Sequence, residues 1–359
     1  MPLMSNQAEG DSADSGLDHD KSAAVIILAH NEASVIEETV RSLHIGKGFQ
    51  DVIHVIADHC QDDTAVRALN AWANVMEIRD GFASGKGTAL KWFVSNAYEL
   101  FKQHDLVVIL DADNHVSSDF WLNIKKAYPG NSVMQCLVQP VGYQGSPLST
   151  LIALSEIHEQ KTVDALRVRF GWPVRLRGTG MVMAPGILKQ VSDMLDTEVE
   201  DIALSLLFTA RGIPVRQNRH IRVFDLKPRE SVLASRQRAR WFRGQWAALW
   251  RYRREVLVLL KSGPAGWSLL SSLFLKPRWL LDAILLLMAI IALPLYWPLA
   301  ALFLVKVLFD LACLAWTILS SENRNEFLKA ILYIPGFIFM WMRGFLLAFR
   351  KYPWLRARE

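Results

Sequence analysis

The sequence has few cysteines and lacks a dinucleotide-binding glycine pattern. Three cysteines, Cys60, Cys136 and Cys313, lie far apart in 359 residues, without a metal-ligand spacing. This odd, scattered set argues against a disulfide framework and predicts free thiols in a reducing compartment. No Gly-x-Gly-x-x-Gly follows the first apolar segment, where AHNEAS (29–34) stands instead. That absence disfavours a dinucleotide-dependent dehydrogenase.

The first 21 residues contain no apolar run. They are polar and acidic, which predicts a disordered tail and excludes a secretory signal peptide in this segment. We therefore expect the domain that follows to remain in the cytoplasm. Hydrophobic residues make up 52% of the chain, and their excess falls after residue 265. A local excess of this kind is typical of membrane helices that follow a water-soluble domain.

Basic residues gather just before that apolar region, in a chain whose net charge is +5. They are Lys227, Arg229, Arg236, Arg238, Arg240, Arg243, Arg251, Arg253 and Arg254. Lysine and arginine beside a membrane segment favour the anionic cytoplasmic surface and mark that side as inside. Tryptophan and leucine are interleaved with the arginines, so we expect contact with lipid head groups and not with nucleic acid.

Apolar segments of strand length alternate with helical patterns in the first part of the chain. We predict strands at 23–29, 52–57, 73–79 and 105–110, and helices at 34–45 and 85–104. This alternation indicates an α/β fold, with a mostly parallel sheet covered by helices on both faces. The later patterns predict strands at 131–140 and 174–184 and helices at 148–168, 199–211 and 230–254.

The chain divides into five predicted regions. They are a disordered acidic tail (1–21), a catalytic α/β domain (22–229), amphipathic interfacial helices (230–277), a transmembrane region of two or three helices (278–350) and a basic tail (351–359). Residues 279–297 and 298–320 are each long enough to cross about 30 Å of hydrocarbon. A third apolar stretch, 327–348, is interrupted by Pro335-Gly336. As a full span it would place the basic tail outside, against the positive-inside tendency, so a third span and an interfacial segment both stay open.

Two ionisable residues stand inside the second predicted span. Lys306 and Asp310 are four residues apart and can pair on one helix face. Ionisable groups at this depth usually face a protein interior or a polar path. A pair that satisfies itself is the favoured interpretation, and the lining of a polysaccharide channel is the alternative.

Two carboxylates follow the buried strand at 105–110. Asp111 and Asp113 are separated by one residue, so both can face one cation. A hard divalent ion, Mg²⁺ or Mn²⁺, would bridge them to a diphosphate and stabilise the charge on a departing nucleotide. An ordinary acidic loop is the alternative.

Polar side chains also follow the first two strands. Asn31 and Glu32 come after the first strand and Asp58 after the second. Because ligands bind beyond the carboxyl ends of parallel strands, these are candidates for contacts with a nucleobase and ribose. A helix-capping role is the alternative for Asn31 and Asp58. Lys86, flanked by two glycines, is a candidate for approach to a phosphate, although such pairs are also common on surfaces.

Two later motifs carry candidates for the chemical step. Glu200 and Asp201 open a helix, where Asp201 is the preferred general base for an acceptor hydroxyl and capping is the alternative. The segment QRARW contains Gln237, Arg240 and Trp241. Arg240 can clamp a phosphate, and Trp241 offers a face on which a sugar can stack. The alternative is a juxtamembrane helix that is only anchored to lipid head groups.

The ordered motifs LAHNE, IADHCQDDT, GKG, DAD, GTG (178–180), VED (199–201) and QRARW resemble those of family 2 glycosyltransferases with the GT-A fold. The chain is similar to the membrane-integrated branch that contains cellulose, hyaluronan and chitin-oligosaccharide synthases and bacterial exopolysaccharide transferases. The resemblance spans roughly residues 23–250, and Gln-x-x-Arg-Trp is its most specific element. The loop HCQDDT departs from the family, in which many members carry a version rich in glycine and serine.

The resemblance implies an inverting, metal-dependent transfer of a hexose or N-acetylhexosamine from a UDP-sugar to a saccharide or lipid-linked acceptor. The synthesis of exopolysaccharide or another cell-surface glycan is the implied setting. The implied roles are uridine contact for Asn31, Glu32 and Asp58, metal and diphosphate binding for Asp111 and Asp113, base catalysis for Asp201, and binding of diphosphate and acceptor sugar for Gln237, Arg240 and Trp241.

The expected location is the inner (cytoplasmic) membrane, with several spans and the catalytic domain facing the cytoplasm. The sequence shows no N-terminal span, so one copy can hardly form the translocation channel of a processive synthase. Processive polymerisation with a homo-oligomer or an export partner is the alternative within the class. A catalytically silent membrane scaffold is the alternative outside it, and the intact carboxylates disfavour it.

Overall fold

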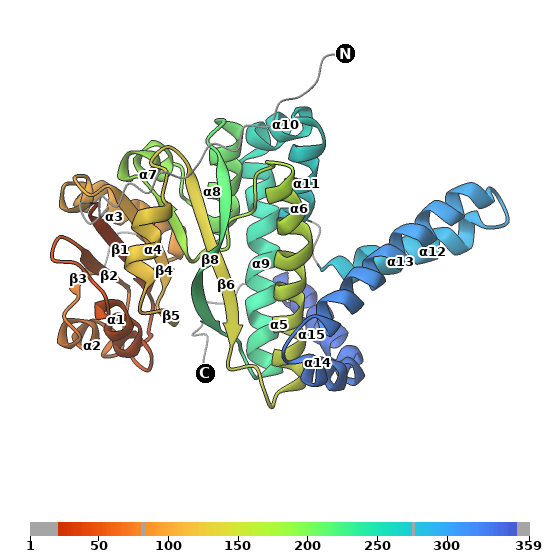
Figure 1. The fold of residues 1–359 in the computed structure, drawn as a ribbon, viewed down its shortest axis with the longest axis horizontal. Helices are drawn as coiled ribbons and strands as arrows, with labels where there is room; N and C mark the ends of the chain where they lie inside the picture. Colours follow the sequence, from red (N-terminus) through yellow and green to blue (C-terminus); the bar gives the residue numbers. More distant parts are fainter. Residues whose placement is uncertain (1–20, 80–83, 275–276, 350–359) are drawn as a thin grey trace, which may run out of the picture.

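The computed structural model describes residues 21–79, 84–274 and 277–349. Apart from Lys21, the two predicted tails lie outside the described residues. The strands are β1 (Ala23–Ala29), β2 (Val52–Asp58), β3 (Asn74–Ile78), β4 (Leu106–Asp111), β5 (Asn114–Val116), β6 (Val133–Val141), β7 (Met181–Met183) and β8 (Val215–Leu226). Within the described chain they form one eight-stranded sheet in the order β3-β2-β1-β4-β7-β6-β8-β5 (Figure 1).

The four early strands pair in parallel, as predicted. Ile27 of β1 lies opposite Val55 of β2 on one side and Leu110 of β4 on the other. Every residue of β1 is buried, which explains why the sequence reads as a continuous apolar run. β7 is antiparallel to both β4 and β6, and β6 is parallel to β8, so the sheet is mixed and mostly parallel.

Helices cover both faces of the sheet. They are α1 (Ile36–His44), α2 (Thr64–Asn70), α3 (Lys86–Phe101), α4 (Phe120–Ala127), α5 (Pro147–Glu159), α6 (Ala165–Arg169), α7 (Pro185–Ser192) and α8 (Glu200–Ala210). Ile26 and Leu28 of β1 point into a core shared with α3, α7 and α8. Val25 and Ile27 point to the opposite face and pack with α1, α2 and α4. The predicted fold class is therefore confirmed.

The predicted strand at 174–184 is largely wrong. Extended pairing is limited to Met181–Met183, because Gly178 and Gly180 adopt left-handed backbone conformations, with φ of +79° and +64°. β8 was not predicted at all. Charged and polar residues occupy much of this strand, and its outward-facing arginines hide the alternation of its buried side chains.

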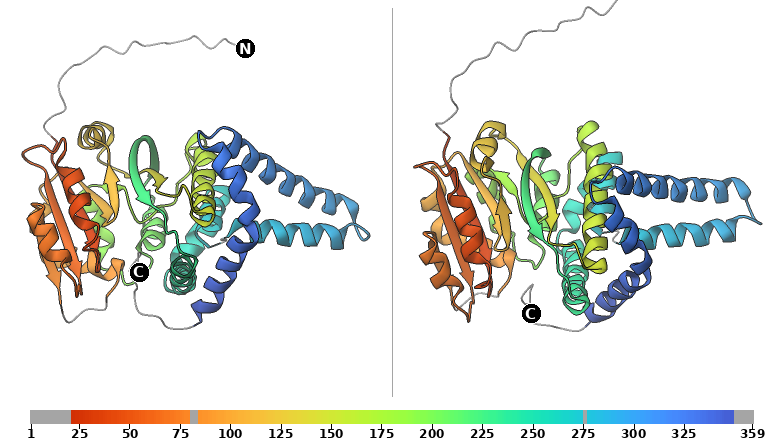
Figure 2. Two further views of the ribbon diagram at one scale, coloured as in Figure 1. Left: turned by 90° about the horizontal axis from the view of Figure 1, so that it is seen from below. Right: turned by 60° about the horizontal axis from the view of Figure 1, so that its bottom comes forward.

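The C-terminal part is helical and packs against the sheet domain through its first long helix. It contains α9 (Ser231–Arg251), α10 (Arg253–Lys261), α11 (Gly263–Phe274), α12 (Arg278–Ala292), α13 (Trp297–Leu319), α14 (Arg324–Ala330) and α15 (Ile334–Ala348). A separate apolar core joins α5 and α9 to α13, α14 and α15, and includes Leu154, Ala234, Phe327 and Met340. Helices α12 and α13 form a hairpin that projects away from the sheet (Figure 2).

In the part of the chain that the structure describes, two helical segments are long and apolar enough to cross a membrane. They are Trp297–Leu319, with a mean hydropathy of 2.1, and Arg324–Ala348, with a mean hydropathy of 1.7. Only 17% and 28% of their most apolar windows are buried, so they differ from the core helices of a soluble protein. The segment predicted at 279–297 ends as a helix at Ala292 and is shorter than these two. The predicted pair of Lys306 with Asp310 is confirmed, and Asp282 of α12 also contacts the Lys306 ammonium, at 3.3 Å.

Candidate active site

A cavity of about 1330 Å³ lies where the carboxyl ends of β1 and β4 meet α5, α8 and α9. Within the described chain, every predicted site residue except Asn31 and Asp58 lines it. These lining residues are Glu32, Lys86, Asp111, Asp113, Glu200, Asp201, Gln237, Arg240 and Trp241. Residues separated by more than 200 positions in the sequence thus share one space.

Lys86 and Asp111 form an ion pair at the inner end of this cavity. The Lys86 ammonium lies 2.5 Å from Oδ1 of Asp111, and both side chains are largely buried. Burial acts to lower the pKa of Lys86, but the carboxylates of Asp111 and Glu200 outweigh it and raise that pKa above its ordinary value. Lys86 is therefore a fixed positive charge beside the first carboxylate of the DAD motif.

Asp113 lies in an excess of negative charge. Burial, reinforced by Asp225, Asp111 and Glu32, raises the pKa of Asp113 to about 8. Clustered carboxylates that hold their protons in this way fit a bound cation, because a cation would favour their ionised forms. Oxygen donors of this type suit Mg²⁺ or Mn²⁺. Among the described residues no three His, Cys, Asp or Glu side chains form a ready metal site.

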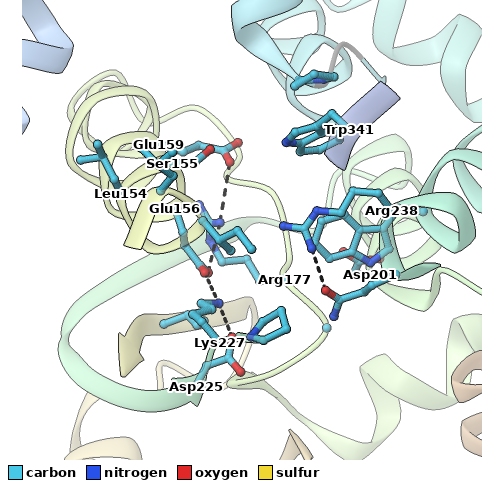
Figure 3. A pocket seen from close by; sticks show the side chains of 18 of the residues that line it. Leu154, Ser155, Glu156, Glu159, Arg177, Asp201, Asp225, Lys227, Arg238 and Trp341 are labelled. Carbon is cyan, nitrogen blue, oxygen red and sulfur yellow. Dashed lines mark hydrogen bonds and ion pairs between the residues drawn. The ribbon is translucent and has the colours of Figure 1, made fainter. Parts of the chain in front are cut away.

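Glu200 and Asp201 occupy the first turn of α8 and differ in exposure. Glu200 is buried, and burial together with Asp201 and Asp111 raises its pKa to about 7, against the opposing effect of Lys86. Asp201 is half-exposed, and its Oδ1 accepts a hydrogen bond of 2.9 Å from the Ile202 amide. Both carboxylates line the cavity, and Asp201 is the more exposed of the two (Figure 3 labels Asp201).

The glycine turn at 178–180 comes close to this pair of carboxylates. A Cβ added to Gly178 would lie 3.1 Å from Oε1 of Glu200 and 3.9 Å from Cβ of Asp201. Thr179, between the two glycines, is buried, and its Oγ1 accepts a hydrogen bond of 3.2 Å from the Asp111 amide. The turn therefore links the DAD and VED motifs and leaves room for the helix that carries Asp201.

Helix α9 brings the Gln-Arg-Ala-Arg-Trp segment to the same cavity. It passes so close to the chain before α8 that a Cβ on Gly244 would lie 2.3 Å from a methyl group of Val199. Nε of Arg240 is buried and has no hydrogen-bond partner among the described residues. Trp241 is half-buried and stacks on Arg238, whose Cζ lies 4.6 Å from the indole centre. The unsatisfied Nε of Arg240 is suited to an anionic ligand.

Asn31 and Asp58 hold neighbouring loops. Oδ2 of Asp58 accepts hydrogen bonds of 2.9 Å from the Ser84 hydroxyl and the Gly85 amide. Oδ1 of Asn31 accepts a hydrogen bond of 2.7 Å from the Gln61 amide. Neither residue caps a helix, since α1 and α2 begin after Val35 and Asp63. These two aspartate and asparagine side chains position the entrance to α3 and the loop after β2.

A buried ionic network on the opposite wall was not predicted. Arg177 Nη1 lies 3.8 Å from carboxylate oxygens of both Glu156 and Glu159, and Lys227 pairs with Glu156 and Asp225 (Figure 3). Burial acts to lower the pKa of Lys227, but its carboxylate partners raise it above the ordinary value. These residues come from α5, the glycine turn and β8, and no shared motif in the sequence links them.

The sequence model of the glycosyl transferase family group 2 matches residues 106–319, and that of glycosyl transferase family 2 matches residues 24–159. The chain belongs to this glycosyltransferase family. The predicted family is therefore confirmed, and the motifs that line the cavity are those of a transferase. A search of curated proteins finds no match to this glycosyltransferase.

A comparison with solved structures finds several that are similar to this glycosyltransferase. A mannosyltransferase from Pyrobaculum calidifontis, in complex with GDP-mannose and Mn²⁺, is similar with a TM-score of 0.53 and 15% identity, over 94% of this chain and 90% of that one. A glucosyl-3-phosphoglycerate synthase from Mycobacterium tuberculosis, in complex with Mn²⁺ and UDP, matches with a TM-score of 0.38 and 17% identity, over 64% and 80% of the two chains. At such identities the first likeness shows the fold alone.

Proposed function

We propose that this glycosyltransferase moves a hexose or N-acetylhexosamine from a UDP-sugar to a saccharide acceptor, with inversion at the sugar carbon. The synthesis of an exopolysaccharide or another cell-surface glycan is the proposed setting. One observation carries the proposal: Asp111 and Asp113, Asp201, and the Arg240-Trp241 pair line a single cavity. A cation site, a base and a platform for phosphate and sugar are the groups that such a transfer needs.

Asp111 and Asp113 would hold Mg²⁺ or Mn²⁺. When bound, the ion supplies positive charge to the diphosphate as the nucleotide departs. Lys86 adds a second positive charge at Asp111, and Arg240 can donate to phosphate oxygens from the other side of the cavity. The Pyrobaculum mannosyltransferase, whose structure contains GDP-mannose and Mn²⁺, supports a metal and nucleotide-sugar site of this kind.

Asp201 would act as the general base. It would accept the proton of the acceptor hydroxyl as that oxygen attacks the sugar carbon and the bond to the diphosphate breaks. The carboxylate is half-exposed to the cavity, whereas Glu200 is buried beside Lys86 and Asp111. Glu200 therefore shapes the charge around the site, and Asp201 has the access that a base requires.

The membrane part suggests where the reaction takes place. We propose that the apolar helices lie in the cytoplasmic membrane and that the catalytic domain faces the cytoplasm. The arginines of α9 and α10 stand beside this region, in agreement with contact to an anionic lipid surface. The acceptor would then be presented at the membrane surface.

Nucleotide release from a panel of UDP- and GDP-sugars tests this function. The full-length protein in detergent would receive Mg²⁺ or Mn²⁺ and a membrane lipid extract as the source of acceptor. We expect turnover of one UDP-sugar, which is lost with a chelator and in an Asp111→Asn/Asp113→Asn variant. Turnover of GDP-sugars alone would contradict the donor assignment, and failure to bind any nucleotide sugar would contradict the transferase function.

A further inference from the structure

The cavity extends beyond the catalytic carboxylates into an apolar groove. This groove lies between α5, α13 and α15, next to the hairpin of α12 and α13. Its lining includes Leu154, Val163, Phe309, Leu314, Ile334 and Ile338. Aliphatic and phenyl side chains give a growing polysaccharide few hydrogen-bond partners, but they suit a hydrocarbon chain.

Arg238 lies between the polar and the apolar ends of this space. It is 3% exposed, and its guanidinium lies over two indole rings, with Cζ 4.6 Å from the centre of Trp241 and 5.3 Å from the centre of Trp341. Nη1 donates a hydrogen bond of 2.8 Å to Oε1 of Gln237, whereas the buried Nε has no partner among the described residues. No carboxylate in the described chain forms an ion pair with it.

A buried guanidinium without a paired anion is costly. Burial lowers the pKa of Arg238 to about 10, and the field of Glu156 only partly offsets this effect. Arg177 and Lys227, by contrast, each have carboxylate partners in the same cavity. Arg238 is thus a buried positive charge for which the described residues supply no carboxylate partner, and a phosphate is the anion that an arginine fork binds well.

We propose that Arg238 binds the phosphate of a lipid-linked acceptor whose single hydrocarbon chain occupies the groove between α5, α13 and α15. This inference rests on the proposed function, since it names the class of acceptor for the same site. The head group of the lipid would reach toward Asp201, which lies on the same side of the pocket as Arg238 (Figure 3).

The surroundings of the groove agree with entry from a bilayer. Leu302, Val305 and Leu308 of α13 are each more than 60% exposed, and the hairpin projects from the body of the protein (Figure 2). In a membrane, lipid would cover these side chains and bring the apolar end of the groove next to hydrocarbon. A single-chain lipid phosphate could then enter with its chain in the groove and its phosphate at Arg238.

Binding of farnesyl phosphate, a single-chain isoprenoid phosphate, tests the inference. Affinity would be measured on the full-length protein in detergent without donor, beside farnesol, inorganic phosphate and dioleoyl phosphatidic acid. Arg238→Gln removes the charge, and Arg254→Gln is the matched control because Arg254 is exposed on α10 and does not line the cavity. Ile338→Trp fills the groove without touching the charge.

We expect Arg238→Gln to weaken farnesyl phosphate binding by at least about tenfold, with farnesol affinity unchanged. Ile338→Trp should weaken the binding of both farnesyl phosphate and farnesol, and Arg254→Gln should change the affinity for neither. Should Arg238→Gln fail to fold, Arg238→Lys and Ile338→Trp carry the test, with Lys retaining part of the phosphate affinity. Equal binding by wild type and Arg238→Gln would overturn the inference, and so would equal affinity for phosphatidic acid or inorganic phosphate.

Donor binding is measured on the same preparations. A protein that binds farnesyl phosphate through Arg238 but binds no nucleotide sugar would refute the proposed function and leave the lipid site standing. A protein that turns over a UDP-sugar but is indifferent to Arg238→Gln would refute the lipid site alone.

Discussion

The ammonium of Lys86 lies 2.5 Å from Oδ1 of Asp111, so a lysine already occupies one oxygen of the proposed metal ligand. The two residues come from the start of α3 and the end of β4. A divalent ion at Asp111 must therefore share this carboxylate with Lys86 or displace it. The pair gives the site a positive charge before any metal binds.

Replacement of Lys86 should raise the affinity for the metal ion and lower the turnover of the sugar donor. In Lys86→Gln we expect Mn²⁺ to bind about three- to tenfold more tightly without donor, because a nearby positive charge is removed. Turnover of the nucleotide sugar should fall, because the diphosphate loses a counter-charge. Calorimetry with Mn²⁺ and a nucleotide-release assay check the two effects. Lys91→Gln, one turn further along α3 and outside the cavity, is the control.

Buried Glu200 should make the metal-free protein less stable at alkaline pH. Its folded-state pKa, about 7, lies above the ordinary value of 4.5. The folded protein therefore holds this proton more tightly than the unfolded chain, and stability falls as the pH rises from about 4.5 through 7. We therefore compare the unfolding temperature of Glu200→Gln with that of wild type at two pH values. We expect the variant to gain stability relative to wild type when the pH is raised from 5 to 8.

Thermal unfolding across pH, with a chelator present, measures this difference. Glu198→Gln is the control, because the Glu198 side chain is 53% exposed and should show no such dependence. A wild-type–variant difference that stays constant between pH 5 and pH 8 would show that Glu200 does not titrate in this range.

The close approach of α9 to Val199 predicts a clash that a second substitution relieves. In Gly244→Ala the new methyl group would meet the Val199 side chain, so α9 and the Arg240-Trp241 pair must shift away from Asp201. We expect a loss of about 1–3 kcal/mol in stability, typical of overpacking, and a fall in turnover. Gly244→Ala/Val199→Ala should recover both.

Unfolding by denaturant and turnover on the same variants provide the readout. Gly186→Ala is the control, because a Cβ at Gly186 of α7 meets nothing within 4 Å. If the double variant is no better than Gly244→Ala, contact with Val199 is not the cause of the defect.

The sequence predicts the sheet domain well where strands are buried on both faces. β1, β2 and β4 are mostly apolar, and the carboxylates that follow β1 and β4, Glu32, Asp111 and Asp113, line one cavity as expected. β8 was not predicted because its exposed positions are occupied by arginine and histidine, which hide the two-residue period of its buried side chains. The glycine turn at 178–180 escapes for another reason, since its conformation depends on positive φ and not on apolarity.

The catalytic wall is predictable from short motifs, but the opposite wall is not. Asp201 and Arg240 stand in compact sequence patterns, whereas Glu156, Arg177 and Lys227 come together only through the fold. Asp58 shows the limit of reasoning from strand ends. Its carboxylate follows β2 as expected, and its Oδ2 accepts hydrogen bonds from the Ser84 hydroxyl and the Gly85 amide that strand-end reasoning does not predict, while its contact with uridine stays a prediction.

Asp201→Asn tests the central claim most directly. Transfer and donor affinity would be measured together, with Asp193→Asn as the control because Asp193 is exposed and does not line the cavity. We predict that Asp201→Asn binds the UDP-sugar with metal as tightly as wild type and that its transfer rate falls by about 10²- to 10⁴-fold. Transfer at the wild-type rate in Asp201→Asn would contradict the assignment of Asp201 as the base and, with it, the proposed arrangement of the site.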